Sequence, residues 1–180
     1  AVHYMNANGF PVLRSVPYAE PPVRCIPAPF YTPTFSFASS NLIREVPSDA
    51  SCAFAHRAET YVQSARYWTH GWTFVQPREA LCFHLSDKSY RKTFEEQLDA
   101  KANQVLRAAG VCRALAVLQK DPCSICGAPR DEHTPSHGIG HMFSTEFPEA
   151  HTVHRDGFGL GKVRTLASFE SHCGVIATND

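Results

Sequence analysis

Apolar and polar residues form their clearest pattern in two stretches that repeat apolar side chains at intervals of three and four, the spacing of one helical face. The first stretch covers residues 48–69 and places arginine, glutamate and glutamine on the opposite side. The second covers residues 87–109 and is followed by Gly110, a residue type that commonly ends helices. Its apolar stripe consists of Tyr90, Phe94, Leu98, Ala102, Val105, Leu106 and Ala109. The pattern predicts two amphipathic helices, and we expect the second to be the core helix.

Two further segments are rich in apolar residues but lack helical spacing. Residues 73–85 contain many β-branched and aromatic side chains, and Pro77 interrupts them, which favours two short extended pieces or an edge strand. Residues 111–119 form an apolar run in which Arg113 is the one charged residue. This run predicts either buried helical turns or a buried strand.

Three glycines at alternate positions, Gly157, Gly159 and Gly161, precede a short alternating segment at residues 162–170. Their spacing matches neither the Walker loop nor the dinucleotide-binding fingerprint. We therefore expect a hairpin turn here in place of a phosphate-binding loop.

The first 47 residues have a composition unlike the rest of the chain. They hold eight of the thirteen prolines, interleaved with tyrosine and phenylalanine. Proline fixes its own backbone torsion and removes a hydrogen-bond donor, so this stretch is expected to be extended and not helical. Its aromatic residues are too numerous for a solvated linker. The sequence predicts an extended arm at residues 1–47 that lies along the domain itself or along another subunit.

Composition and charge narrow the fold and the partners. The chain of 180 residues is 43% hydrophobic, and its 17 basic residues balance 17 acidic ones. This balance leaves no overall field that would favour nucleic acid or anionic lipid as a partner. No run of about 18 apolar residues and no retained signal peptide is present, so no membrane span is expected. We predict a small α+β protein, with one globular domain at residues 48–180 behind the arm at residues 1–47.

The seven cysteines bear on the compartment of the protein. Two of them form a C-x2-C pair, and five are scattered. A chain of this size does not need disulfides, so most of the scattered ones are expected to be buried thiols in a reducing intracellular compartment, an organelle or a virion. The scattered cysteines are Cys25, Cys52, Cys82, Cys112 and Cys173.

Residues that bind metal are concentrated at residues 121–143. A C-x2-C pair followed by histidines at intervals of four provides the thiolate and imidazole ligands that Zn²⁺ prefers. The candidate ligands are Cys123, Cys126, His133, His137 and His141. Because Pro135 requires a turn, His141 is favoured over His137 as the fourth ligand. The sequence predicts a structural zinc site whose loop packs against the second helix.

The segment at residues 131–141, DEHTPSHGIGH, resembles the centre of HNH endonucleases. In that family an acidic residue and a histidine precede a proline and glycines, the histidine activates water, and an upstream C-x2-C belongs to a structural zinc. Here only six residues separate Cys126 from His133, and no second C-x2-C follows. The resemblance implies an HNH-like nuclease as the alternative enzyme. A zinc-containing nucleic-acid-binding module is the other alternative function.

The function predicted from the sequence is non-catalytic. No nucleophile with a well-placed base, no open metal position and no phosphate loop is evident, so no catalytic residue is assigned. A neutral chain with an aromatic arm and a metal used for folding suits an accessory subunit of a large assembly, such as a virion, a ribosome or a respiratory complex. Residues 1–47 are expected to contact the other protein subunits of that assembly.

Overall fold

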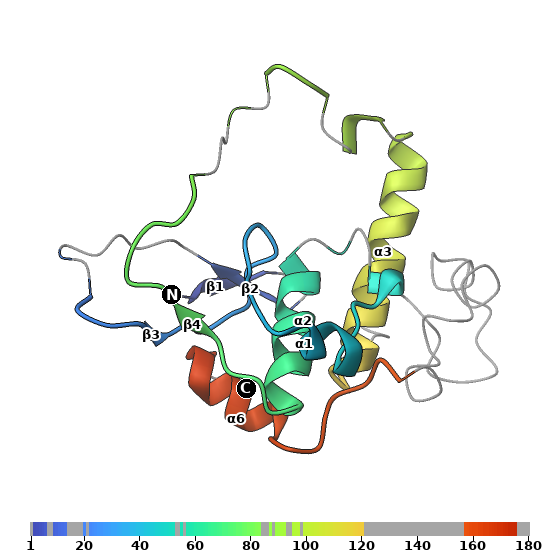
Figure 1. The fold of residues 1–180 in the computed structure, drawn as a ribbon. Helices are drawn as coiled ribbons and strands as arrows, with labels where there is room; N and C mark the ends of the chain where they lie inside the picture. Colours follow the sequence, from blue (N-terminus) through green and yellow to red (C-terminus); the bar gives the residue numbers. More distant parts are fainter. Residues whose placement is uncertain are drawn as a thin grey trace.

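The computed structural model describes most of the chain outside residues 121–156. The described residues are 2–6, 9–13, 20, 22–52, 55, 57–83, 87, 89–92, 95–97, 99–120 and 157–175. They form a mixed arrangement of helices and two small antiparallel sheets (Figure 1). The helices are α1 (Ser40–Glu45), α2 (Arg57–Thr69), α3 (Ala100–Val117) and α6 (Leu166–Cys173), with 3₁₀ turns at Ala50–Cys52 and Glu95–Gln97. The strands are β1 (Val2–Met5), β2 (Pro11–Leu13), β3 (Ile26–Pro27) and β4 (Val75–Gln76). The predicted α+β class is confirmed at this level.

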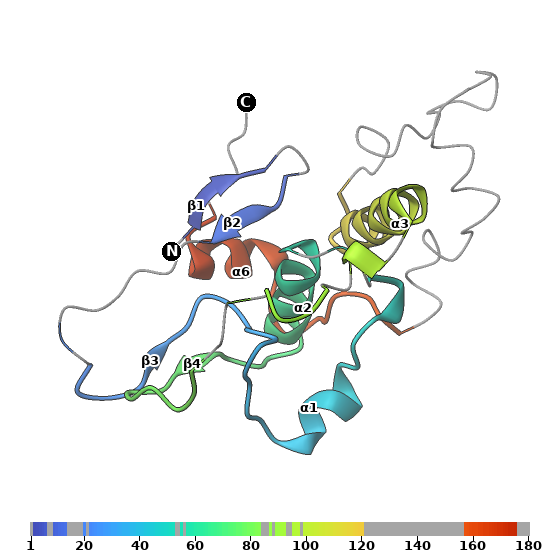
Figure 2. The same cartoon turned by 90° about the horizontal axis from the view of Figure 1, so that it is seen from above.

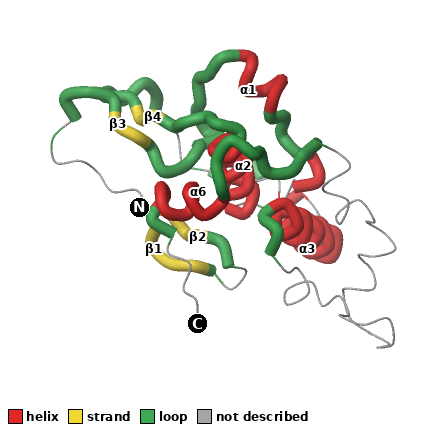
Figure 3. Tube along the Cα trace, turned by 90° about the horizontal axis from the view of Figure 1, so that it is seen from below, coloured by secondary structure: helices red, strands yellow, loops and turns green. Residues whose placement is uncertain are grey.

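Helix α2 is the centre of the molecule and contacts α3, α6 and β2. The two strand pairs, β1 with β2 and β3 with β4, lie on opposite sides of α2 and α6 in both views along the vertical axis (Figures 2 and 3). Helix α3 lies on the remaining side, next to α2. Among the described helices, none is long and apolar enough to cross a membrane.

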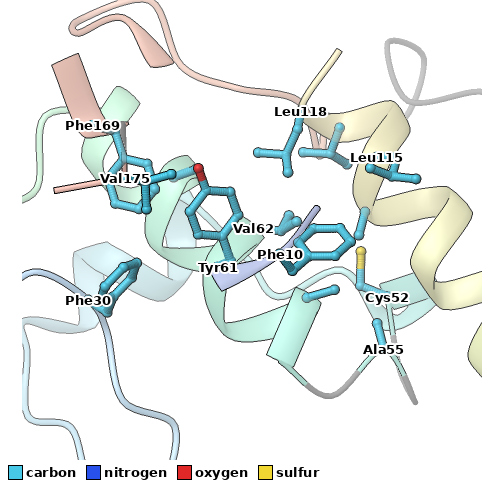
Figure 4. Packing of buried hydrophobic residues seen from close by; sticks show 14 of the residues in the cluster. Phe10, Phe30, Cys52, Ala55, Tyr61, Val62, Leu115, Leu118, Phe169 and Val175 are labelled. Carbon is cyan, nitrogen blue, oxygen red and sulfur yellow. The ribbon is translucent and has the colours of Figure 1, made fainter. Parts of the chain in front are cut away.

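The hydrophobic core draws on segments that are far apart in the sequence. Tyr61 of α2 is 1% exposed and stands between the ring of Phe10 and the ring of Phe169 (Figure 4). Phe30 packs edge to face on Phe169, with ring centroids 6.0 Å apart. Leu115 of α3 closes the other end of the cluster. Burying such large side chains contributes on the order of 2 kcal/mol each before entropy is counted.

The segment at residues 157–165 docks on the end of α2 through backbone contacts. The carbonyl of Thr69 accepts hydrogen bonds from the amides of Val163 and Arg164, at 2.9 and 3.1 Å. Gly161 lies so close to this end that a Cβ atom there would fall 2.5 Å from the Thr69 carbonyl. Only glycine therefore permits this approach.

Helix α6 follows this docked segment and has a cap at each end. The hydroxyl of Thr165 accepts from the amide of Ser168, which satisfies an N-terminal donor. Gly174 adopts a left-handed conformation, with φ of 70°, at the C-terminal end. The prediction of a hairpin turn leading into an alternating segment is therefore wrong, because the capped helix α6 occupies much of residues 162–170. Residues 166–170 of the alternating segment are thus helical and not part of a strand.

The second predicted helix exists, but its bounds are wrong. Asp99 caps α3 by accepting from the amides of Lys101 and Ala102, so the helix begins well after residue 87. Tyr90 is 63% exposed and lies outside the core. Gly110 is buried inside α3 instead of ending it. A mid-helix glycine costs about 1 kcal/mol, and burial of the apolar run that follows it outweighs that cost. Of the two alternatives for residues 111–119, the helical one is confirmed.

The first predicted helix and the segment after it are closer to the sequence pattern. The helix expected over residues 48–69 starts with the 3₁₀ turn and becomes α2 only at Arg57. Within residues 73–85, the two residues of β4 pair with β3, which agrees with the prediction of short extended pieces.

The extended arm expected over residues 1–47 is not confirmed as such. Helix α1 lies inside it, where the sequence is free of proline between Pro33 and Pro47. Phe10, Val12 and Phe30 are buried, so this part of the chain contributes to the core. Whether residues 1–47 also contact another subunit stays a prediction.

Candidate functional site

A hollow of about 460 Å³ opens between the β3–β4 pair and the segment at residues 30–38. The backbone amide of Tyr31 donates to the Ser64 hydroxyl at 3.0 Å, which fastens this segment to α2. The amide of Ala28 donates to the Phe74 carbonyl at 2.9 Å, which continues the β3–β4 pairing beside it. Two loops that are more than 30 residues apart in the sequence thus form opposite walls. The lining residues are Cys25, Ala28, Phe30, Tyr31, Thr32, Phe35, Ser36, Phe37, Ala38, Leu42, Tyr67, Trp72, Thr73, Phe74, Val75, Gln76, Pro77 and Leu81.

Aromatic rings form the floor of the hollow and part of its rim. Tyr67 of α2 is buried and packs edge to face on Tyr31, with ring centroids 5.2 Å apart, and against Phe74 at 6.4 Å. At the rim, Phe35 is half exposed and Phe37 is 96% exposed. The floor is therefore fixed by mutual packing, while the rim offers apolar surface to a ligand.

No charged residue is among the described residues that line the hollow. Its polar groups include the side chains of Thr32, Ser36, Thr73 and Gln76, besides those of the tyrosines and Trp72. Pockets of this size with a few polar groups among aromatic walls are typical small-ligand sites. The lining suits a neutral ligand that has both apolar faces and hydroxyl groups, and it does not suit a polyanion.

Arg164 holds one wall of the hollow in position from behind. Its guanidinium donates to the Trp72 carbonyl at 3.0 Å and to the Thr73 hydroxyl at 3.2 Å, and it stacks 4.4 Å from the centre of the Trp68 ring. The indole N–H of Trp72 donates to the carboxylate of Glu45 at 3.2 Å. Glu45, at the end of α1, thereby places a carboxylate beside the hollow.

A second polar region lies inside the protein, between α2, α3 and the 3₁₀ turn at Ala50–Cys52. Nε of Arg113 donates to Oδ2 of Asp49 at 2.7 Å, and both side chains are at most 3% exposed. Arg66 is also fully buried, and its Nη1 donates to the Pro47 carbonyl and to Oε1 of Gln63. Burial lowers the pKa of Arg66, while the negative charge of Asp49 acts in the opposite direction. The guanidinium remains charged, because arginine does not lose its proton in proteins.

The buried titratable side chains near the core are chemically inert in this environment. Burial, together with the charge of Asp49, raises the pKa of Cys52 to about 12. Burial raises the pKa of Tyr61, whose hydroxyl donates to Glu170 at 3.1 Å, far above its ordinary value. A thiol or phenol that keeps its proton is a poor nucleophile, so neither is a catalytic candidate.

The five predicted zinc ligands, Cys123, Cys126, His133, His137 and His141, all lie outside the described residues. The zinc site and its loop therefore stay predictions. Within the described part of the chain, no group of three or more histidine, cysteine, aspartate or glutamate side chains could hold a metal ion.

The five scattered cysteines only partly follow the expectation of buried thiols. Cys52 and Cys173 are buried and free, whereas Cys25 and Cys82 are free but exposed. Cys112 is disulfide-bonded. Only two of the five are thus buried free thiols, so the expectation that most of them are is wrong; chain length decides whether disulfides are needed and not whether they form.

Sequence reasoning missed the hollow entirely. The signal for the hollow is the density of aromatic residues in two stretches, at residues 30–37 and 67–74. The first stretch was expected to belong to an arm and the second to the end of a helix. The pairing of β3 with β4 brings these stretches together, and a pairing of two-residue strands leaves no periodic pattern to detect.

The comparison with known families identifies the class of protein. The family model described as glycosyltransferase (GlcNAc) matches residues 2–179, and the chain belongs to this family. No curated protein and no solved structure matches the chain. The prediction that the protein is not an enzyme is therefore wrong, since it belongs to a family of glycosyltransferases. The absence of a recognisable nucleophile or phosphate loop misled that prediction, because transfer between bound substrates needs neither motif.

Proposed function

We propose that this protein transfers an N-acetylglucosamine residue from a phosphate-activated donor to an acceptor hydroxyl group. The match of the glycosyltransferase (GlcNAc) family to residues 2–179 is the observation that carries this proposal. The aromatic hollow supports it, because a sugar ring combines an apolar C–H face with hydroxyl groups at its edge. Those are the two properties that the lining of the hollow suits.

The proposed reaction sets definite tasks for the protein. The bond between the anomeric carbon and the phosphate oxygen of the donor breaks, and a bond from that carbon to the acceptor oxygen forms. The acceptor proton passes to a base, and the phosphate leaves with the electron pair of the broken bond. Catalysis then requires that the two substrates are held in line, that a base is within reach and that the leaving charge is stabilised. The hollow would serve the first task by holding a neutral sugar against Phe35, Phe37 and Phe74.

Turnover of the donor tests the proposal directly. Purified protein is incubated with nucleotide-activated N-acetylglucosamine and, separately, with nucleotide-activated glucose. We expect release of the nucleotide and of free N-acetylglucosamine, with water as the acceptor, and slower release from the glucose donor. Failure to turn over either donor over a range of added divalent cations would count against the proposal.

Two matched phenylalanine substitutions test the place of the hollow. Phe37→Ala removes a rim residue that is 96% exposed, and Phe83→Ala removes one that is 94% exposed and does not line the hollow. Binding of N-acetylglucosamine, followed by saturation-transfer NMR, should weaken in Phe37→Ala and stay unchanged in Phe83→Ala. Equal losses in both variants would place the sugar elsewhere.

The family match leaves the other predicted roles untested. A zinc ion held by Cys123, Cys126, His133 and His141, or His137, stays a prediction that elemental analysis of the purified protein can test. Docking of residues 1–47 on other subunits of an assembly, and the resemblance to HNH nucleases, also stay predictions.

A further inference from the structure

Arg66 has one edge of its guanidinium occupied and the other edge empty. Nη1 donates to the Pro47 carbonyl at 2.6 Å and to Oε1 of Gln63 at 2.9 Å. Nε and Nη2 are buried and have no hydrogen-bond partner among the described residues. The side chain is fully buried on α2. An unpaired donor on a buried charge is costly, so this edge requires an explanation.

The two empty donors form a pair of defined geometry. In a guanidinium group, Nε–H and the Nη2–H next to it point in the same direction and form a fork. This fork matches two oxygens of one phosphate or carboxylate group, which is the strongest arrangement that arginine makes. A single water molecule could accept from the fork but would bring no negative charge.

Asp49, the nearby acidic residue, is already engaged by other donors. Its Oδ2 accepts from Nε of Arg113 at 2.7 Å and lies 3.8 Å from the thiol of Cys52. Its Oδ1 accepts from the amide of Ser51 at 2.9 Å. The charge of Asp49 acts on Arg66 from a distance, but its oxygens do not fill the fork.

Phe158 covers Arg66 and is flanked by two glycines. Its ring centre lies 5.5 Å from Cζ of Arg66. The flanking residues are Gly157 and Gly159, and a Cβ atom at either would meet nothing within 4 Å. Gly161, by contrast, is fixed against the end of α2. The segment is thus fixed against α2 at Gly161, while the glycines on either side of Phe158 have open space where a side chain would stand.

We propose that the fork of Arg66 binds two oxygens of a phosphate group, with Phe158 displaced from its resting position over the guanidinium. Given the proposed transfer of N-acetylglucosamine, on which this inference rests, the phosphate is that of the sugar donor. The bound arginine then stabilises the charge of the leaving phosphate.

Inorganic pyrophosphate is the probe that separates this inference from the transfer activity, because it contains no sugar. Isothermal titration of the full chain should detect binding to the wild type. Arg66→Lys retains the charge but loses the fork, and should bind at least about tenfold more weakly. Arg78→Lys, at an exposed arginine, is the matched control and should bind as the wild type does.

Substitutions of Phe158 keep the test decisive if Arg66→Lys does not fold. Phe158→Ala removes the cover and should bind pyrophosphate as tightly as the wild type or more tightly. Phe158→Glu places a competing carboxylate beside the fork and should bind it at least about tenfold more weakly. The inference is overturned if neither the wild type nor Phe158→Ala binds pyrophosphate, or if Phe158→Ala and Phe158→Glu bind it equally.

Two further ligands distinguish the source of the phosphate. Inorganic phosphate and nucleotide-activated N-acetylglucosamine are titrated into the same variants. Weakening of the sugar nucleotide by Phe158→Glu, in parallel with pyrophosphate, assigns the fork to the donor. A sugar nucleotide that binds all variants alike would overturn the assignment to the donor, even if transfer activity is present.

Discussion

The hollow and the Arg66 fork begin at neighbouring residues of one helix but have opposite properties. Tyr67 forms the floor of the hollow, and Arg66, about 100° away around α2, carries the fork. The hollow has room for a ligand and no described charged residue in its lining. The fork has charge, but Phe158 covers it. The difference teaches that neighbouring residues of one helix can face an uncharged aromatic hollow and a buried charged region.

The largest expected effect concerns the charged region. Asp49→Ala leaves the buried Arg113 without its carboxylate partner and should destabilise the protein by about 3–5 kcal/mol. Urea denaturation followed by circular dichroism measures the change. Asp49→Asn retains an acceptor for the Ser51 amide and should cost less. A loss below about 1 kcal/mol for Asp49→Ala would mean that the pair contributes no more than an exposed one.

The second prediction concerns the segment that connects both regions. Residues 157–165 carry Phe158, which covers the fork, and lead to Arg164, which holds the wall of the hollow. Gly161→Ala would place a methyl group 2.5 Å from the backbone of Thr69, and should destabilise the protein by about 1–3 kcal/mol.

Gly159→Ala is the matched control, because its Cβ would meet nothing within 4 Å, and it should change stability by less than about 0.5 kcal/mol. Amide chemical shifts should move at both regions in Gly161→Ala. Chemical-shift changes confined to the hollow or to the surroundings of Arg66 would mean that residues 157–165 do not link the two regions.

A third, smaller effect is expected in alkaline solution. Burial raises the pKa of Cys52 from its ordinary value of 9.0 to about 12. As pH rises, the unfolded chain therefore loses the thiol proton before the folded protein does. Between these two pKa values the unfolded state binds fewer protons than the folded state. The contribution of Cys52 to the free energy of unfolding is therefore complete below the ordinary pKa and is lost as pH rises toward the pKa of the folded protein.

Urea midpoints at about pH 8 and about pH 10 measure this contribution. Cys52→Ala should show a smaller fall between the two than the wild type, whereas Cys82→Ala, at an exposed cysteine, should show the same fall as the wild type. An equal fall in all three proteins would mean that Cys52 loses its proton in the folded state.

The smallest expected effect on stability concerns the hollow. Phe37→Ala removes a side chain that is 96% exposed, and should change the free energy of unfolding by less than about 0.5 kcal/mol. Together with a loss of sugar binding, this result would separate binding from folding. A loss above about 1 kcal/mol would mean that Phe37 is packed in solution, and the rim would then belong to the core.

The sequence predicted those elements of the fold whose signal is a local, periodic pattern of apolar residues. The apolar spacing that predicts α2 works because the helix buries one wide face, including Tyr61, Val62 and Ala65. The bounds of α3 were missed because Asp99 caps the helix well after residue 87, and because the helix continues through Gly110. Burial beyond Gly110 decided the outcome, and burial depends on neighbours that the local pattern does not contain.

The candidate sites were harder to predict than the fold. Both depend on contacts across large separations in the sequence, such as Arg164 with Trp72 and Arg66 with Pro47. The glycines near Phe158 were interpreted by comparison with phosphate loops and set aside on spacing. Their role follows from where they place Phe158 and how closely Gly161 meets α2, and neither is encoded in a motif.

The distribution of the core along the chain also governs how the protein folds. Phe10, Tyr61 and Phe169 meet in one cluster although about 160 residues separate the first from the last. During synthesis at roughly 5–20 residues per second, Phe10 and Tyr61 leave the ribosome many seconds before Phe169 is made. Until Phe169 is made, the aromatic face of α2 lacks its partner and is exposed. Chaperones bind surfaces of this kind. We expect high contact order to make refolding in vitro slow and prone to aggregation, with α6 as the last element to dock.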